Sequence, residues 1–278
     1  MLLAIAKFDW HWRYASVALT LRGSLMKKVE KHGEMMADEE PVLVEQKEGW
    51  AEIVLNRPER RNSVIPPLSD GVRLALSELA ANDNIACVIL RGAGGYFCSG
   101  VDLKALQADP PPAWKTRQFS SWRELHLALY HFPKPVICAL EKYGINAGSA
   151  LALACDLIVA GETAYLQVGE IQQGAMMPMN AAWFKIKSTE QVMARMALLG
   201  DRVSGPELFR LGLVTESVAD ETVVSRCREL AMRIAGNPPG AARNIKLSMI
   251  DQRGIADPEA FFRQPTSQAL MTAGMVKG

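Results

Sequence analysis

The sequence predicts an α/β protein in which strands alternate with helices, followed by a part that is mostly helical. Short runs of apolar and β-branched residues recur between stretches with helical spacing, the pattern of βαβ crossovers around a buried sheet. The strand pattern nearly disappears after Pro178. The chain has 278 residues, 49% hydrophobic and 22% charged, which is enough to build one full core and excludes a disordered or disulfide-scaffold protein.

The first predicted elements are a β-hairpin and a helix. Apolar and polar residues alternate over 42–47 and 50–55, and Glu48-Gly49 interrupts the alternation where a turn is needed. Apolar residues then recur at helical spacing over 67–81, with proline in the first turn. The hairpin therefore leads directly into the first helix.

The same alternation continues through the middle of the chain. Predicted strands cover 86–90, 136–140 and 157–160, and predicted helices cover 118–132 and 147–155. Further helices are predicted at about 188–199, 205–211, 220–236 and 238–252. The predicted organisation is a poorly ordered N-terminal extension over 1–40, an α/β core over 41–200 and a C-terminal helical region over 201–278.

Composition argues against several classes of function. Lys and Arg number 31 against 30 Asp and Glu, so the net charge of +1 gives no support for a nucleic-acid-binding protein. Every apolar run falls well short of the ~20 residues of a membrane span, so no membrane association is expected. The 5 cysteines form no CxxC pair and predict buried free thiols in a cytoplasmic protein. The 4 histidines lack metal-ligand spacing, so no metal site is predicted.

Common catalytic signatures are absent from the sequence. Phe97 stands where a GxGxxG dinucleotide loop requires glycine, and no GxxxxGK[ST] phosphate loop occurs. Ser99 and Ser149 lack the flanking glycines of a GxSxG nucleophile elbow. Dinucleotide, nucleoside triphosphate and serine-nucleophile chemistry are therefore disfavoured.

Two loops rich in glycine and small residues remain, over 91–103 and 143–150, and each directly follows a predicted strand. Such loops let a ligand approach main-chain N–H groups closely. The second loop also opens an apolar helix, whose first N–H groups have no intrahelical partner. Facing each other, the loops would form a main-chain oxyanion hole. The residues leave an alternative equally open, namely two ordinary βα turns with glycines for tight packing.

Five segments together resemble the crotonase superfamily, the enoyl-CoA hydratase/isomerase family. They are Leu55–Ser63, Phe97–Lys104, Ala147–Gly161, Leu199–Ser204 and Leu211–Val214. The resemblance spans about 41–243 and implies a crotonase-like fold of repeated ββα units with a helical C-terminal part that assembles homotrimers or a dimer of trimers. It implies an acyl-CoA thioester substrate, with coenzyme A as part of the substrate and no separate cofactor.

The resemblance also implies an oxyanion hole made by the backbone N–H groups of Ser99 and Ala147. These would hold the thioester oxygen while a proton is removed from the neighbouring carbon, and each such donor typically lowers the barrier by ~3–4 kcal/mol. Coenzyme A or substrate contacts are implied for six further residues: Arg57, Arg60, Arg61, Gly100, Asp102 and Leu103. Arginine suits phosphate by its bidentate fork. The alternative for the arginines is a solvated turn paired with Glu59.

The carboxylates depart from the family pattern. Hydratases of the family carry two glutamates, and the resemblance places the first at Ala150 and the second at Glu170. Apolar neighbours of Glu170 favour a pocket over a surface loop. One carboxylate suits proton transfer within the substrate, so enoyl-CoA double-bond isomerisation by Glu170 is the leading prediction. Hydration by Glu170 alone, thioester hydrolysis, decarboxylation and non-catalytic acyl-CoA binding or scaffolding remain alternatives.

The segment after Glu170 departs from the family pattern as well. Where the family has a glycine-rich stretch after its proline, this chain has Met176 and Met177 before Pro178 and Met179 after it. Methionine is bulky and adaptable. These side chains belong either to the core or to an acyl pocket of unusual form.

Overall fold

The computed structural model describes residues 40–263, so the predicted N-terminal extension up to residue 39 and the last part of the predicted helical region lie outside it. A six-stranded sheet has the order β1-β2-β3-β4-β6-β9, in which β1 is antiparallel to β2 and all other neighbours are parallel. The strands are β1 (Val42–Gln46), β2 (Trp50–Leu55), β3 (Cys87–Gly92), β4 (Val136–Leu140), β6 (Leu157–Gly161) and β9 (Glu216–Val218).

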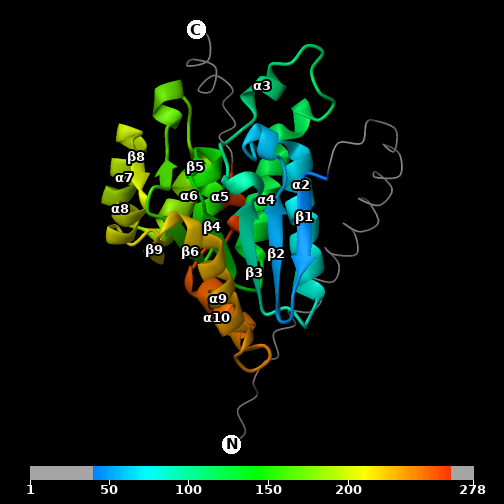
Figure 1. Ribbon diagram of the computed structural model, residues 1–278. Helices are drawn as coiled ribbons and strands as arrows, with labels where there is room; N and C mark the ends of the chain where they lie inside the picture. The colour runs from blue at the N-terminus through cyan, green and yellow to red at the C-terminus, as the bar shows by residue number, and fades with distance from the viewer. Residues whose placement is uncertain (1–39, 264–278) are drawn as a thin grey trace, which may run out of the picture. The chain divides into compact units, whose positions relative to one another are not determined.

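A second, three-stranded sheet lies beside the first (Figure 1). Its strands are β5 (Tyr143–Ile145), β7 (Tyr165–Gln167) and β8 (Arg202–Ser204). Strand β5 pairs in parallel with β7, which pairs antiparallel with β8. Strands β8 and β9 come from beyond residue 200, so the segment after that residue contributes a strand to each sheet.

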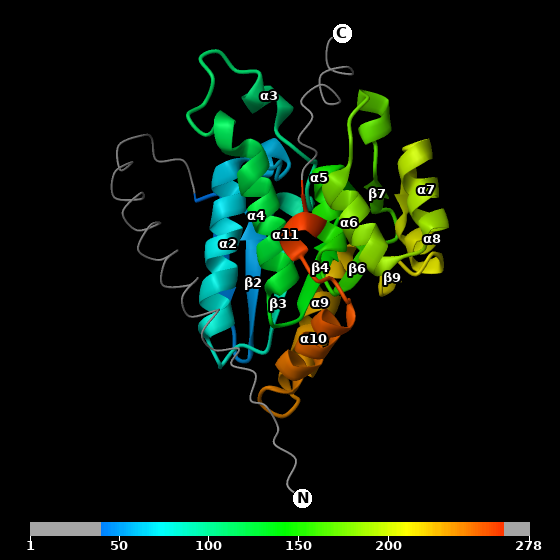
Figure 2. The ribbon, with the colours of Figure 1, turned by 180° about the vertical axis from the view of Figure 1, so that it is seen from behind.

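Helices cover both faces of the large sheet. Helix α9 (Val223–Ala235) lies on one face, and α2 (Pro66–Ala81) and α4 (Gln118–His131) lie on the other (Figures 1 and 2). Side chains of β2 point alternately to the two faces of the sheet. Ile53 packs into the apolar cluster that includes α2 and α4, and Trp50 packs into the one that includes α9. The other helices are α3 (Leu103–Leu106), α5 (Ala147–Leu153), α6 (Pro178–Lys187), α7 (Glu190–Leu199), α8 (Gly205–Arg210), α10 (Ala241–Gln252) and α11 (Pro258–Phe261).

The predicted α/β class is confirmed, and the longer predicted elements match the observed ones within a few residues. After Pro178, where the strand pattern nearly disappears, the structure has two short strands that the sequence did not predict, β8 and β9. Strands of three residues are too short to show a period in the sequence. Helix α6 was also missed, because its buried residues, Trp183 and Phe184 among them, surround it too widely to give an amphipathic pattern.

A buried carboxylate ties the sheet to α9. Glu52 of β2 is fully buried and accepts hydrogen bonds from Arg91 of β3 and, at 2.6 Å, from Nε of Arg228. Burial acts to raise the pKa of Glu52, but the hydrogen bonds and charges of Arg228 and Arg91 outweigh burial and lower the pKa. The ionised carboxylate therefore stabilises the folded state.

Replacing Glu52 with glutamine is expected to lower the free energy of unfolding by about 1–3 kcal/mol near neutral pH, because two charge-assisted hydrogen bonds are lost. The folded-state pKa lies below the ordinary value of 4.5, so this stabilisation is present above that value and is lost as pH falls through the folded-state pKa. Urea unfolding at about pH 7 and about pH 4 should show the deficit shrinking at the lower pH. An equal deficit in Glu229→Gln, an exposed partner of Arg226, would contradict this role of Glu52.

Candidate active site

The two glycine-rich loops lie against each other. The N–H of Cys98 donates to the carbonyl of Tyr143 at 3.1 Å, and the N–H of Ile145 donates to the carbonyl of Cys98 at 3.1 Å. A Cβ atom at Gly148 would lie 2.3 Å from the Cys98 carbonyl oxygen, so only glycine permits this approach. Tertiary hydrogen bonds thus join the two predicted oxyanion loops at the end of the large sheet.

Ala147 opens α5 with its backbone N–H free of any hydrogen-bond partner within residues 40–263. The preceding residue, Asn146, has φ 50 and makes two hydrogen bonds with the segment before Glu170. Its N–H donates to the carbonyl of Gln167 at 2.8 Å, and its Oδ1 accepts from the N–H of Gly169 at 2.7 Å. The loop before Glu170 therefore fixes the direction of this unpartnered donor.

Ser99 differs from Ala147, because its N–H donates to the carbonyl of Arg61 at 3.1 Å. Arg61 and Asn62 both have positive φ, 52 and 54. The buried Asn62 side chain holds this turn through hydrogen bonds from Nδ2 to the carbonyls of Ala93 at 3.0 Å and Tyr96 at 2.7 Å. A thioester oxygen at the Ser99 amide would have to share the proton with Arg61 or displace its carbonyl.

Asp102 forms ion pairs with two of the predicted arginines. Arg57 Nη2 lies 3.0 Å from Oδ2 and Arg60 Nη2 lies 2.6 Å from Oδ1 of this buried carboxylate, which also accepts the N–H of Ala105 at the start of α3. Burial acts to raise the pKa of Asp102, but hydrogen bonds from Arg60, Ala105 and Arg57 outweigh it and hold the pKa well below the usual range. Asp102 therefore joins the turn after β2 to the first glycine-rich loop.

A wide-open surface cavity of about 260 Å³ lies beside this cluster. Its lining residues are Glu59, Arg60, Arg61, Ser63, Ser99, Val101, Asp102 and Leu103. Most of the predicted coenzyme A and oxyanion residues are thus brought to one place. Gly100, with φ 97, lies at the contact of the two loops, because a Cβ atom there would be 2.9 Å from the carbonyl oxygen of Ile145. Four of the predicted site residues are outside the lining: Arg57, Gly100, Ala147 and Glu170.

Glu170 begins the 3-10 turn η5 (Glu170–Gln173) and is partly buried. Asn180 of α6 donates from Nδ2 to Oε1 of Glu170 at 2.8 Å, while the buried Oε2 has no partner within residues 40–263. Burial raises the pKa of Glu170, and the hydrogen bonds from its own N–H and from Asn180 offset only part of that rise. A carboxyl with a raised pKa and an unpartnered oxygen has the properties of a general base.

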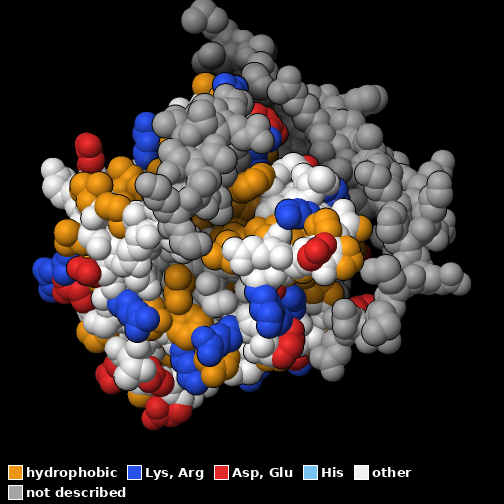
Figure 3. All heavy atoms as spheres, turned by 90° about the horizontal axis from the view of Figure 1, so that it is seen from above, with side chains coloured by type: hydrophobic (Ala, Val, Ile, Leu, Met, Phe, Trp, Pro, Cys, Tyr) orange, Lys and Arg blue, Asp and Glu red, His pale blue; other side chains and the backbone are white. Residues whose placement is uncertain are grey.

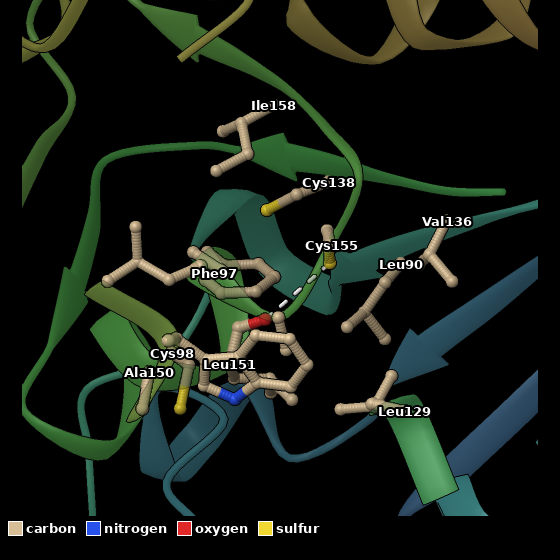
Figure 4. Packing of buried hydrophobic residues seen from close by; sticks show 14 of the residues in the cluster. Leu90, Phe97, Cys98, Leu129, Val136, Cys138, Ala150, Leu151, Cys155 and Ile158 are labelled. Atoms are coloured by element: carbon tan, nitrogen blue, oxygen red, sulfur yellow. Dashed lines mark hydrogen bonds between the residues drawn. The ribbon is translucent and has the colours of Figure 1, made fainter. Parts of the chain in front are cut away.

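No carboxylate accompanies Glu170 from position 150. Ala150 is 1% exposed and belongs to the buried apolar cluster of Figure 4, together with Phe97, Cys98 and Leu151. Two of the three methionines belong to the core alternative, because Met179 is buried and Met177 packs against the same apolar cluster. Met176 is 47% exposed, and its place in an acyl pocket stays a prediction.

Two functional candidates were missed in the sequence: Asn146 and Asn180. A signal for Asn180 exists, because a lone amide stands among apolar residues at the start of α6. Asn146 gives no signal, since asparagine is ordinary in a turn before a helix. Their roles depend on contacts between segments far apart in the chain.

The sequence pattern of the enoyl-CoA hydratase/isomerase family matches residues 45–268. The chain belongs to this family. It is 31% identical to the 1,2-epoxyphenylacetyl-CoA isomerase of Escherichia coli over 203 residues, 71% of this chain and 77% of the relative. It is 30% identical to an enoyl-CoA hydratase of Mycobacterium tuberculosis over 225 residues, 79% of this chain and 84% of the relative.

The fold agrees with solved members of the family. An enoyl-CoA hydratase from Bacillus anthracis superposes with a TM-score of 0.71 at 26% identity, covering 80% of this chain and 86% of that one. The predicted crotonase fold and the prediction of a crotonase-type enzyme are confirmed. Trimer assembly stays a prediction. Among the helices of residues 40–263, none has the length and apolar character needed to cross a bilayer.

Proposed function

We propose that the protein isomerises the double bond of an enoyl-CoA thioester, with Glu170 moving the proton. The observation that carries this proposal is the partly buried carboxylate of Glu170, one oxygen of which has no partner within residues 40–263, together with a buried alanine at position 150, where the family resemblance places the first glutamate. Glu170 removes a proton from the carbon next to the thioester carbonyl and returns it two carbons further along. The base needs a free lone pair for this, and Oε2 supplies one.

The negative charge that develops on the thioester oxygen requires preorganised donors. The N–H of Ala147 has no partner within residues 40–263 and can donate to that oxygen directly. The N–H of Ser99 can donate to it once its hydrogen bond to the Arg61 carbonyl breaks. Arg60 and Arg61 line the cavity beside Ser99 and provide cationic groups for the coenzyme A phosphates, with Gly100 and Leu103 in the same loop. Assembly into homotrimers belongs to the same proposal.

The end of the molecule that carries α3 supports a substrate with both charged and apolar parts. Seen from above in Figure 3, basic and hydrophobic side chains are interspersed there. Leu103 and Met176 are 43% and 47% exposed despite their apolar character. An acyl chain would cover such side chains, while arginine holds the phosphates.

Hydration is the second candidate. The buried Oδ1 of Asn180 and Oε2 of Glu170 both have no partner within the described part of the chain, and the two side chains are hydrogen-bonded to each other. Two such acceptors could hold one water molecule, which is what addition to the double bond needs. Several relatives, including those of Mycobacterium tuberculosis and Thermus thermophilus, are named hydratases.

Incubation with 2-enoyl-CoA and 3-enoyl-CoA in deuterated water, followed by mass spectrometry, tests the proposal. Isomerisation interconverts the two substrates, with deuterium incorporated to the extent that the proton on Glu170 exchanges with solvent. Formation of 3-hydroxyacyl-CoA as the main product would favour hydration. Acyl-CoA binding with no product from either substrate would support a non-catalytic binding protein and refute the enzyme.

The pH dependence of kcat/KM should follow the ionisation of Glu170. Its pKa in the folded enzyme lies above the ordinary 4.5 because of burial, and only the ionised form accepts a proton. The value of kcat/KM should therefore rise with pH, and the midpoint of this acidic limb should lie above 4.5. Initial rates between about pH 4 and pH 8 measure this limb. A limb centred below the ordinary value would contradict the buried environment of the base.

A further inference from the structure

One amide nitrogen joins the two halves of the candidate site. Asn180 Nδ2 donates to Oε1 of Glu170 at 2.8 Å and to the carbonyl of Asn146 at 3.0 Å. We propose that Asn180 is a positioning residue that couples the Glu170 carboxylate to the Asn146–Ala147 peptide group. This inference rests on the proposed function, since it assigns Glu170 as the base and the Ala147 N–H as an oxyanion donor.

The contact with Asn146 acts on the oxyanion donor directly, because the carbonyl of Asn146 and the N–H of Ala147 belong to one planar peptide group. That carbonyl accepts two hydrogen bonds, from Asn180 Nδ2 and from the N–H of Ala150 at 3.1 Å. Donors at the oxygen end polarise the whole group and strengthen its N–H as a donor. They also hold this peptide plane at the orientation set by the ψ of −106 that Asn146 adopts.

The contact with Glu170 sets the orientation of the carboxylate. Oε1 is engaged by Asn180, which leaves Oε2 as the unpartnered oxygen. Three influences set the pKa of this group: burial, its own backbone N–H and Asn180; none of them is a charged side chain. Asn180 is therefore the one side chain among residues 40–263 that favours the ionised form.

Asparagine suits this position by its chemistry. Both partners are acceptors, so the side chain must present a nitrogen with two protons, which an aspartate of the same shape does not have. Asn180 is 2% exposed, and its Oδ1 has no partner within residues 40–263. Burying an amide with an unpartnered oxygen costs stability, and a helix start with apolar neighbours would pack as well with leucine or alanine. This loss of stability is explained if the Asn180 amide positions Glu170 and the Asn146–Ala147 peptide group.

Asn180→Ser and Asn180→Asp test the coupling, with Ser121→Ala as the matched control. Ser121 is buried and its hydroxyl bonds Asp70 at 2.9 Å, so the control loses a buried hydrogen bond without touching Glu170 or Asn146. We expect kcat to fall by about 10-fold to 10²-fold in both Asn180 variants with KM nearly unchanged, because the base and the donor lose their alignment. The control should retain wild-type kcat.

Two further readouts separate positioning from a merely structural role. The acidic limb of kcat/KM should move to higher pH in Asn180→Ser, and further in Asn180→Asp, because loss of the donor and then a like charge both disfavour ionised Glu170. The absorption of bound para-dimethylaminocinnamoyl-CoA reports polarisation of the thioester carbonyl. Its red shift should be smaller in both variants than in the wild type, and unchanged in Glu170→Gln.

Each outcome decides the inference. Movement of both the pH limb and the red shift supports the coupling. Movement of one alone, or of neither, in folded variants overturns it, and if Asn180→Ser does not fold, Asn180→Asp gives the same decision because it has the same shape. The red shift needs no turnover. A wild type that polarises the probe through Asn180 but does not isomerise enoyl-CoA would therefore refute the proposed function and leave the peptide contact standing.

Discussion

Replacing Glu170 with glutamine is expected to lower kcat for isomerisation by about 10²–10⁴-fold, the usual contribution of general acid–base catalysis. Glutamine has the same shape, and its Oε1 can still accept the hydrogen bond that Asn180 donates at 2.8 Å to the carboxylate. It cannot remove a proton. Affinity for acyl-CoA should change little, since the backbone donors and the arginines are untouched. Steady-state kinetics and calorimetric titration measure the two effects separately.

The same substitution should stabilise the protein near neutral pH. The folded-state pKa of Glu170 is raised, so the group favours folding fully below its unfolded pKa near 4.5 and less as pH rises through the folded value. A neutral glutamine removes that penalty. Melting temperatures above wild type at about pH 7 but not at about pH 4 would show it. Near-normal turnover in Glu170→Gln, matching the exposed control Glu162→Gln, would remove Glu170 from its role.

Substitution of Gly148 by alanine is expected to reduce kcat by about 10²–10³-fold, the effect of losing one oxyanion donor. The new methyl would lie 2.3 Å from the carbonyl oxygen and 3.0 Å from the carbonyl carbon of Cys98, both backbone atoms that cannot move alone. The two loops must therefore separate, which moves the adjacent N–H of Ala147 away from its partner loop.

Gly236→Ala is the matched control for this change. Its methyl would meet the carbonyl oxygen of Met232 at 3.4 Å, an ordinary contact, in a backbone conformation open to alanine. Circular dichroism should show both variants folded, and the cinnamoyl-CoA probe should lose its red shift only in Gly148→Ala. Full turnover in Gly148→Ala would mean that the close contact of the loops is not needed to align the donors.

The sequence alone determined most of the longer elements and the family. Period-2 and period-3.6 patterns are local, so strand β4 at 136–140 and helix α2 at 66–81 follow from their own residues. Motifs in the sequence also identified the two glycine-rich loops, and they showed that Ala150 stands where hydratases of the family carry a glutamate. Strands such as β9, three residues long, had no local signal and formed because a neighbouring strand offered hydrogen bonds.

Only the tertiary structure decided how the site residues are partnered. The sequence predicts phosphate contacts for Arg57 and Arg60, and only the structure shows that both also pair with Asp102, which lies 45 and 42 residues away. Asn180 meets the carbonyl of Asn146 across 34 residues and Glu170 across 10. Hydrogen bonds act over about 3 Å in space, whatever the separation along the chain. Residue types therefore predicted which groups this site needs, and the packing of α5, α6 and the two loops decided which groups meet.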